Sequence, residues 1–177
     1  MPLVETIDSI EVNILFDIIA EIISNYTMEH HVLLKITKLT STRILKEIKS
    51  PSIKNRKIEG HNVIISKCFY MLRILCSNEK FVLNNLNDIE SFLDPIFAYL
   101  KAPVSFNFED EIFEIMKKIL NFTKTLTNLS KNLFSNLDYY QKKNNHLNQE
   151  FFELICCYLT FGNEMVNNNE MFCQLVN

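Results

Sequence analysis

The sequence has little glycine and no tryptophan: it contains 2 glycines and 4 prolines in 177 residues. Tight hairpins, strained nucleophile turns and phosphate-binding loops all depend on glycine at positive φ. The scarcity of glycine therefore excludes Rossmann and P-loop motifs and predicts helices joined by short polar loops. A chain of this length corresponds to about one domain, so we expect a single helical domain over residues 1–177.

Recognisable catalytic and metal-binding motifs are also missing. The chain has 4 histidines, of which His30 and His31 are adjacent. Neighbours on a helix point about 100° apart, so these two do not converge on one metal ion. No Cys-x-x-Cys pair of the kind that holds zinc is present, and no Ser/Cys–His–Asp arrangement can be assembled. We therefore predict no catalytic residue, no cofactor and no metal, and a protein that is not an enzyme.

The cysteines and the N-terminal stretch bear on the compartment. The number of cysteines is odd, and the first apolar stretch lacks a basic leader and is interrupted by Asp17 and Glu21. These features predict reduced thiols inside a cell and no membrane partner. The net charge of −3 does not indicate direct binding to nucleic acid. Four of the cysteines are interpreted as core residues, namely Cys68, Cys76, Cys156 and Cys157.

Apolar residues recur at helical spacing along most of the chain. The first stretch shows the pattern of one apolar helix face, with a spacing of three or four residues from Ile7 through Ile10, Ile14 and Ile18 to Ile22. The predicted helices cover about residues 7–24, 28–49, 61–77, 88–100, 107–126, 130–142 and 150–161. We also expect a short helical turn at 78–88 and a frayed eighth helix within 163–177.

Residues of known capping preference mark the helix ends. The predicted N-caps are Thr27, Ser130 and, for the helix that starts with Glu109, Asn107 or Phe108, and Gly162 is the predicted C-cap. Pro95 lies inside the helix that Asp88 opens, so we expect a kink at Pro95 or a helix that begins near residue 94.

The predicted helices group into pairs. The first helix of each pair recurs about every 43 to 54 residues, close to the period of HEAT or armadillo arrays. The sequence therefore predicts an all-α fold, a short α-solenoid of three to four HEAT-like antiparallel helix pairs. An up-down helix bundle shows similar apolar stripes and stays open as an alternative.

Four carboxylates open the segment from Phe106 to Leu120, namely Glu109, Asp110, Glu111 and Glu114. Paired catalytic carboxylates need one desolvated member, which consecutive residues on an exposed first turn do not provide. Negative charge at a helix start offsets the helix dipole and contributes about 0.3–1 kcal/mol per group. We interpret this acidic cluster as a helix start, with a docking surface for a basic peptide as the alternative.

The second predicted helix carries the opposite charge. Lys35, Lys38, Lys46 and Lys49 recur at spacings of 3, 8 and 3 residues, so much of their charge lies near one face. Together with the acidic cluster and with Asp88, Glu90 and Asp94, they predict a surface with one basic and one acidic edge. The acidic edge is the better candidate for a Lys/Arg-rich cargo or tail.

Three segments carry a resemblance to a known family: "LNNLNDIESFLDPIFAYLKAP", "FNFEDEIFEIMKKILNFTKTLTNLSKNLFSNLDYYQ" and "FFELICCYLTFGN". In order and spacing they resemble the C-terminal HEAT repeats of importin-β-type nuclear transport receptors (karyopherins), most of all the subgroup of importins seven and eight. Receptors of this family are several times longer, and their Ran-binding surface lies mainly in N-terminal repeats without a counterpart here. The tryptophans that often clasp cargo are absent as well.

The resemblance implies a protein–protein interaction module for nucleocytoplasmic transport, as a fragment or a reduced relative of a longer receptor. Its expected partners are proteins: a basic cargo, subunits of an assembly, or nucleoporins. No residue carries over as a Ran contact, so Ran is not expected to bind this segment alone. The alternative is an α-helical scaffold or adaptor inside a larger complex that has no role in transport.

Overall fold

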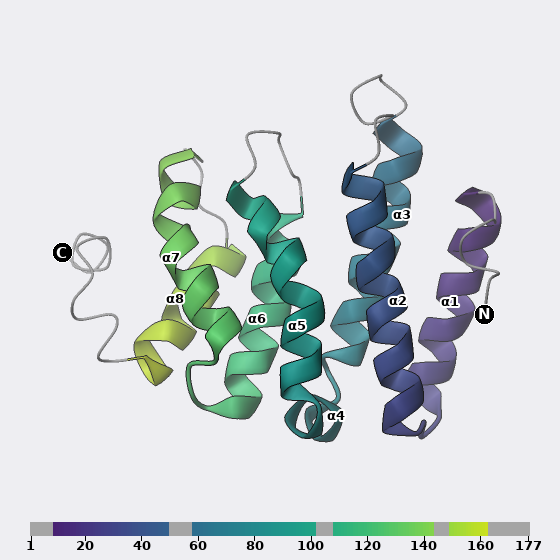
Figure 1. The fold of residues 1–177 in the computed structure, drawn as a ribbon, viewed down its shortest axis with the longest axis horizontal. Coiled ribbons are helices and arrows are strands. Elements are labelled where there is room, and N and C mark those ends of the chain that lie inside the picture. Colours follow the sequence, from purple (N-terminus) through teal and green to yellow (C-terminus); the bar gives the residue numbers. More distant parts are fainter. Residues whose placement is uncertain (1–8, 50–57, 102–107, 144–148, 163–177) are drawn as a thin grey trace. The chain divides into compact units, whose positions relative to one another are not determined.

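The computed structural model describes residues 9–49, 58–101, 108–143 and 149–162, and every regular element in these ranges is helical (Figure 1). The predicted all-α class is therefore confirmed. The chain divides into two compact units, unit 1 (Met1–Phe92) and unit 2 (Leu93–Asn177). The boundary falls inside one helix, α5 (Leu86–Phe97). The single helical-repeat domain expected for residues 1–177 stays a prediction.

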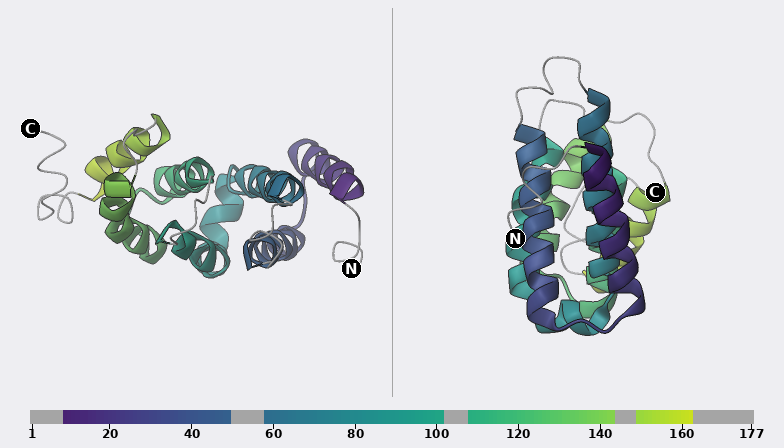
Figure 2. Two further views of the ribbon diagram at one scale, coloured as in Figure 1. Left: turned by 90° about the horizontal axis from the view of Figure 1, so that it is seen from above. Right: turned by 90° about the vertical axis from the view of Figure 1, so that its right-hand side faces the viewer.

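Unit 1 is built on three long helices, α1 (Ser9–Asn25), α2 (His30–Lys49) and α3 (Ile58–Leu75), followed by the short α4 (Glu79–Asn84). The short connection between α1 and α2 makes them antiparallel, and α3 packs against both. Seen from above, α1 and α3 lie in one layer and α2 in the other (Figure 2). The core of unit 1 includes the fully buried Ile44, Cys68, Phe69, Met71, Leu72, Leu75 and Phe81.

The inner face of α2 also buries polar groups. Thr37 is fully buried, and its hydroxyl donates to the Leu33 carbonyl at 2.8 Å. Glu47 is buried too, and Arg43 Nε lies 2.6 Å from its Oε1. The hydrogen bond of Thr37 satisfies a hydroxyl that would otherwise cost about 1–3 kcal/mol on burial, and the charge of Arg43 offsets the charge of the buried Glu47. Cys68 belongs to the same core, where burial raises the pKa of its thiol to about 12.

Unit 2 contains the end of α5, a 3-10 helix η3 (Ala98–Lys101), and α6 (Glu109–Thr123), α7 (Asn128–Lys143) and α8 (Gln149–Phe161). α6 packs against α8, and α7 packs against η3. Tyr158 of α8 is fully buried, and its hydroxyl donates to the Ser130 carbonyl of α7 at 2.6 Å. The ring centroids of Tyr158 and Phe134 are 5.0 Å apart in an edge-to-face arrangement, so one side chain joins α8 to α7.

Two helix starts differ from the predicted ones. α2 begins at His30 and not at residue 28, because the Leu33 amide donates to the Glu29 carbonyl at 3.2 Å. Glu29 therefore precedes the first turn, and Thr27 is not the cap. In α7 the Ser130 amide donates to Thr127 Oγ1 at 3.2 Å. Thr127 is thus the N-cap, and the predicted cap Ser130 lies inside the first turn.

The start of α6 agrees with one of the two predicted caps. Its N-cap is Phe108, whose side chain makes no capping hydrogen bond, and the other predicted cap, Asn107, lies outside the described residues. α5 begins at Leu86, two residues before the predicted start, and continues through Pro95 into η3. The frayed helix predicted within 163–177 also lies outside the described residues.

The C-terminal ends of α6 and α8 differ in the backbone conformation of the residue that follows the helix. Lys124 ends α6 in the left-handed region with φ 54°, and its amide donates to the Leu120 carbonyl. Gly162 ends α8 as predicted, but no described glycine has positive φ. Position 162 requires glycine because there is no space for a side chain: a Cβ there would lie 2.8 Å from both Leu126 Cδ1 and the Tyr158 carbonyl oxygen.

Candidate interaction surfaces

The acidic cluster lies at the start of α6, as predicted. Glu109, Asp110 and Glu111 are its first three residues, and Glu114 pairs with Lys118 on the same helix at 3.4 Å. Asp110 is exposed, whereas the other three carboxylates are half-buried. Since all four take part in interactions within the molecule, helix-start stabilisation accounts for their position. Docking of a basic peptide stays a prediction.

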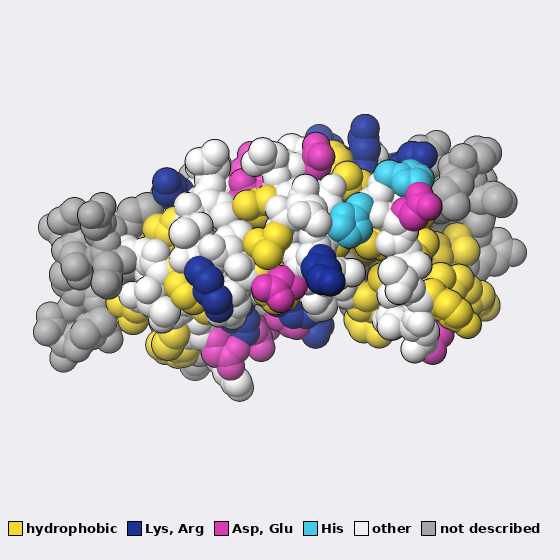
Figure 3. Space-filling view, turned by 90° about the horizontal axis from the view of Figure 1, so that it is seen from below, with side chains coloured by type: hydrophobic (Ala, Val, Ile, Leu, Met, Phe, Trp, Pro, Cys, Tyr) yellow, Lys and Arg dark blue, Asp and Glu magenta, His cyan; other side chains and the backbone are white. Residues whose placement is uncertain are grey.

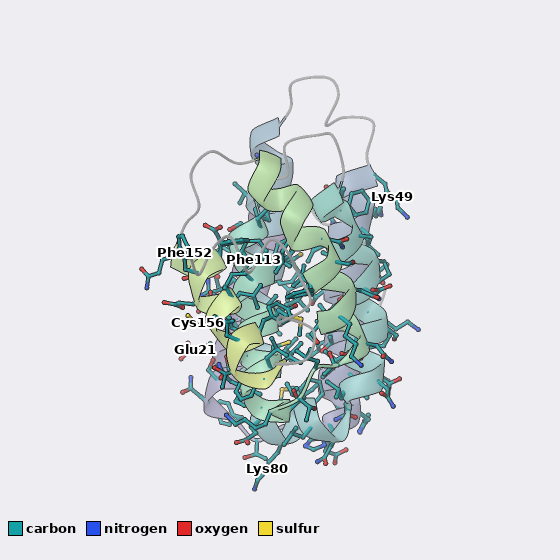
Figure 4. The ribbon with its side chains drawn as sticks, turned by 90° about the vertical axis from the view of Figure 1, so that its left-hand side faces the viewer. Glu21, Lys49, Lys80, Phe113, Phe152 and Cys156 are labelled. Carbon is teal, nitrogen blue, oxygen red and sulfur yellow. The ribbon has the colours of Figure 1, made fainter. Side chains whose placement is uncertain are left out.

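The four lysines predicted as a basic edge come together on the outer face of α2. Lys35, Lys38, Lys46 and Lys49 are all exposed, and at about 100° per residue they fall within an arc of about 80°. No described residue forms an ion pair with any of them. We refer to these four residues as the lysine stripe. Lys49 projects away from the end of α2, at the opposite end of unit 1 from Lys80 on α4 (Figure 4).

An apolar surface lies beside the lysine stripe. Ile14, Ile18 and Ile22 follow one face of α1 with 58%, 53% and 41% of their surface exposed, and hydrophobic side chains gather at this end of unit 1 (Figure 3). Next to them is a hollow of about 40 Å³, which we name the α1–α2 groove. It is lined by Leu15, Phe16, Ile19, Ile36, Leu39, Thr40 and Met71.

The cysteine pair of α8 does not lie in the core, so that prediction is wrong. Cys156 is exposed and Cys157 is half-buried, and Cys156 shares the outer face of α8 with Phe152, which is 48% exposed (Figure 4). The buried face of α8 consists instead of Phe151, Leu154, Ile155 and Tyr158. The prediction that Cys68 and Cys76 are core residues is confirmed, since both are fully buried.

An ion cluster that the sequence reasoning missed joins α6 to α8. The Lys117 ammonium group bonds to the carboxylates of Glu150 and Glu153. Partial burial acts to lower the pKa of Lys117, but its bonds to the two carboxylates raise it above the ordinary value. The hydrogen bond from Lys117 and a second one from Gln149 lower the pKa of Glu153. The i,i+3 spacing of the two glutamates was the available signal, but their partner lies on another helix.

No described residues form a group of three or more metal-ligating side chains. The α1–α2 groove is much smaller than the roughly 300–1,000 Å³ of a ligand pocket, so it has room for the tip of a side chain. Within the described ranges, no helix is both long and apolar enough to span a bilayer.

Comparison of the chain with protein-family models, curated proteins and solved structures finds no match.

Proposed function

We propose that the chain is a protein–protein interaction module, and that it serves nucleocytoplasmic transport in the manner of an importin-β-type receptor. The observation that carries the first part is the outer surface of α1 and α2. An exposed isoleucine stripe there borders a groove and four lysines without a described ion-pair partner. Contiguous exposed apolar surface of this kind is typical of partner-binding sites. Support for the transport role comes from the sequence resemblance alone.

The proposal includes a cytoplasmic and nuclear location and protein partners such as a basic cargo, assembly subunits or nucleoporins. The test is a pull-down from native lysate with the whole chain as bait, at low and at moderate salt, with bound proteins identified by mass spectrometry. Recovery of imported proteins or nucleoporins supports the transport role. Recovery of the subunits of one unrelated assembly overturns it in favour of a scaffold. Ran loaded with GTP is added in a parallel sample, and the chain alone is not expected to retain it.

A second experiment tests the acidic cluster within this function. The four substitutions Glu109→Gln, Asp110→Asn, Glu111→Gln and Glu114→Gln are combined, and binding to a synthetic Lys/Arg-rich peptide is followed against ionic strength. If the cluster docks basic partners, affinity and its salt dependence fall, because screened charges steer association. A control changes net charge equally at Asp17, Glu21, Glu29 and Glu79, which are all exposed and lie outside the acidic edge. Equal binding by the two variants shows that the cluster is only a helix start.

A further inference from the structure

The lysine stripe is long enough to contact several turns of a partner helix. At a rise of about 1.5 Å per residue, Lys35 and Lys49 are about 21 Å apart along α2. Glu47, the one acidic residue near them on this helix, is buried against Arg43 and faces away from the stripe. Four exposed positive charges therefore line one side of α2 with no described carboxylate to neutralise them.

The α1–α2 groove runs beside this stripe. Leu39 directly follows Lys38 and is both 39% exposed and part of the groove lining. Ile36 directly follows Lys35 and also lines the groove, while Met71 of α3 is fully buried and closes its base. On the far side, Leu15 and Ile19 continue into the exposed isoleucines of α1. The surface thus consists of the apolar α1–α2 groove with the lysine stripe along one of its edges.

The kind of partner follows from this combination. An apolar groove between two helices matches the apolar face of a third helix, as in helix-in-groove recognition. Lysines along its edge favour carboxylates on the flank of that helix. A nucleic acid would leave the apolar groove uncovered, and the net charge of −3 repels a polyanion. A flat bilayer surface does not fill a hollow that is sized for a side-chain tip.

We propose that the α1–α2 face binds an acidic amphipathic helix of a partner protein. An aliphatic side chain of that helix enters the α1–α2 groove, and its carboxylates meet the lysine stripe. The inference rests on the proposed function in that it takes the chain to be a protein-binding module, and it adds a partner opposite in charge to the basic cargo.

The probe is a synthetic peptide of about 18 residues, long enough to span the stripe as a helix, with leucine on one face and glutamate on its flanks. Binding to the whole chain is measured by fluorescence anisotropy. One comparison peptide carries lysine in place of glutamate, and another has the same composition without an apolar face. We expect the acidic amphipathic peptide to bind at least tenfold more tightly than either, with an affinity that falls as salt rises.

Two variants of the chain locate the site. Lys35→Glu combined with Lys38→Glu should weaken binding tenfold or more. Leu39→Asp should do the same, because it removes an apolar contact of the groove and adds a charge that repels the glutamates of the peptide. Exposed residues of α4 supply matched controls, Lys80→Glu and Leu83→Asp, which should leave binding unchanged. Circular dichroism and urea midpoints confirm that each variant is folded. Lys35→Gln with Lys38→Gln replaces the charge-reversal pair if that pair loses helix.

Several results would overturn the inference: equal binding of all three peptides, equal loss in the α4 controls, or displacement of the peptide by an RNA oligonucleotide or by vesicles rich in phosphatidylserine. Concentration-dependent dimerisation that Leu39→Asp abolishes would assign the face to a second copy of the chain and would also overturn it. Failure here leaves the proposed function standing if the pull-down still recovers transport partners. If the pull-down recovers no transport partner but the acidic peptide still binds tightly, the proposed transport function fails and the acidic-helix site stands.

Discussion

At the scale of the single residue, Tyr158 shows how one side chain can join two helices. Its ring is buried against Phe134, and its hydroxyl donates to the Ser130 carbonyl at 2.6 Å. Tyr158→Phe keeps the ring and removes that bond, so we expect a loss of about 0.5–1.5 kcal/mol in the free energy of unfolding. Urea denaturation followed by circular dichroism measures it. Phe134→Leu should cost a similar amount through packing, and no change in either variant would contradict this contact.

Gly162 is constrained by space rather than by its backbone angle. The Cβ of an alanine would lie 2.8 Å from the Tyr158 carbonyl oxygen, a backbone atom that cannot move without disturbing the end of α8. We expect Gly162→Ala to lower the free energy of unfolding by about 1–3 kcal/mol. Gly60→Ala is the matched substitution within helix α3, where alanine is favoured over glycine by up to about 1 kcal/mol. Equal thermal midpoints for the two variants would show that the space around Gly162 adapts.

At the scale of the element, the existence of the helices was predictable from the sequence. The apolar stripe of α6 is an example: Ile112, Ile115 and Ile119 recur at helical spacing and are all fully buried. Such a stripe is a local property of the sequence and indicates a helix, but it does not say what covers the stripe. The predicted stripe of α1 shows this, since Ile14, Ile18 and Ile22 are 41–58% exposed. The predicted helices agree with the observed ones to within a few residues at most ends, as expected when several polar residues compete to cap a helix.

The errors arose where orientation depends on a neighbouring helix. The segment "FFELICCYLTF" is apolar around most of its circumference, with Glu153 and Thr160 as its polar residues, so its sequence specifies the buried face only weakly. In the structure α8 packs against α6 and contacts α7 through Tyr158. This arrangement buries Phe151, Leu154, Ile155 and Tyr158 and leaves Cys156 on the outside. Lys117 and the α1–α2 groove were unpredictable for the same reason, because both require knowing which helices are adjacent. The lysine stripe needed one helix only, and it was predicted.

The ion cluster between α6 and α8 gives a prediction at this scale. Lys117→Met should lower the free energy of unfolding near neutral pH by about 1–2 kcal/mol, because two carboxylates lose a shared cation. Lys118→Met is the control: Lys118 pairs with Glu114 on its own helix, and such pairs contribute about 0.3–0.5 kcal/mol. Equal losses in the two variants would contradict a special role for the link between helices.

The pH dependence of this cluster has a definite sign. The pKa of Glu153 is lowered from 4.5, so its contribution is present above pH 4.5 and is lost as the pH falls through the folded-state value. The pKa of Lys117 is raised from 10.5, so its contribution is lost as the pH rises through that higher value. The stability difference between the wild type and Lys117→Met should therefore be largest between these limits. Urea midpoints across the pH range measure it, and a difference that is independent of pH would refute the assignment.

At the scale of the whole molecule, the two charged surfaces belong to different compact units. The lysine stripe lies in unit 1 and the acidic cluster in unit 2. They also differ in availability, because the lysines are exposed without described ion-pair partners, whereas the acidic residues take part in interactions within the molecule. Since each surface lies within one unit, each can be tested with its own set of variants.

Both units should lose stability at alkaline pH. Burial raises the pKa of Cys68 in unit 1 from 9.0 to about 12 and raises that of Tyr158 in unit 2 above its usual 10.0. A group whose pKa is higher in the folded state holds its proton there after the unfolded chain has released it. Its contribution is therefore complete below the unfolded-state pKa and declines as the pH rises, by about 1.4 kcal/mol per pH unit for each group.

Urea unfolding between about pH 8 and pH 11 measures this decline. We expect the free energy of unfolding to fall from about pH 9, where the unfolded Cys68 thiol ionises, and to fall more steeply above pH 10, where unfolded Tyr158 ionises as well. Cys68→Ala should remove the first part of the decline and Tyr158→Phe the second, although each variant is less stable at neutral pH. The exposed Tyr70 is the control, because Tyr70→Phe removes a phenol that solvent already reaches. An alkaline decline of the same slope in all four proteins would mean that neither buried group controls it.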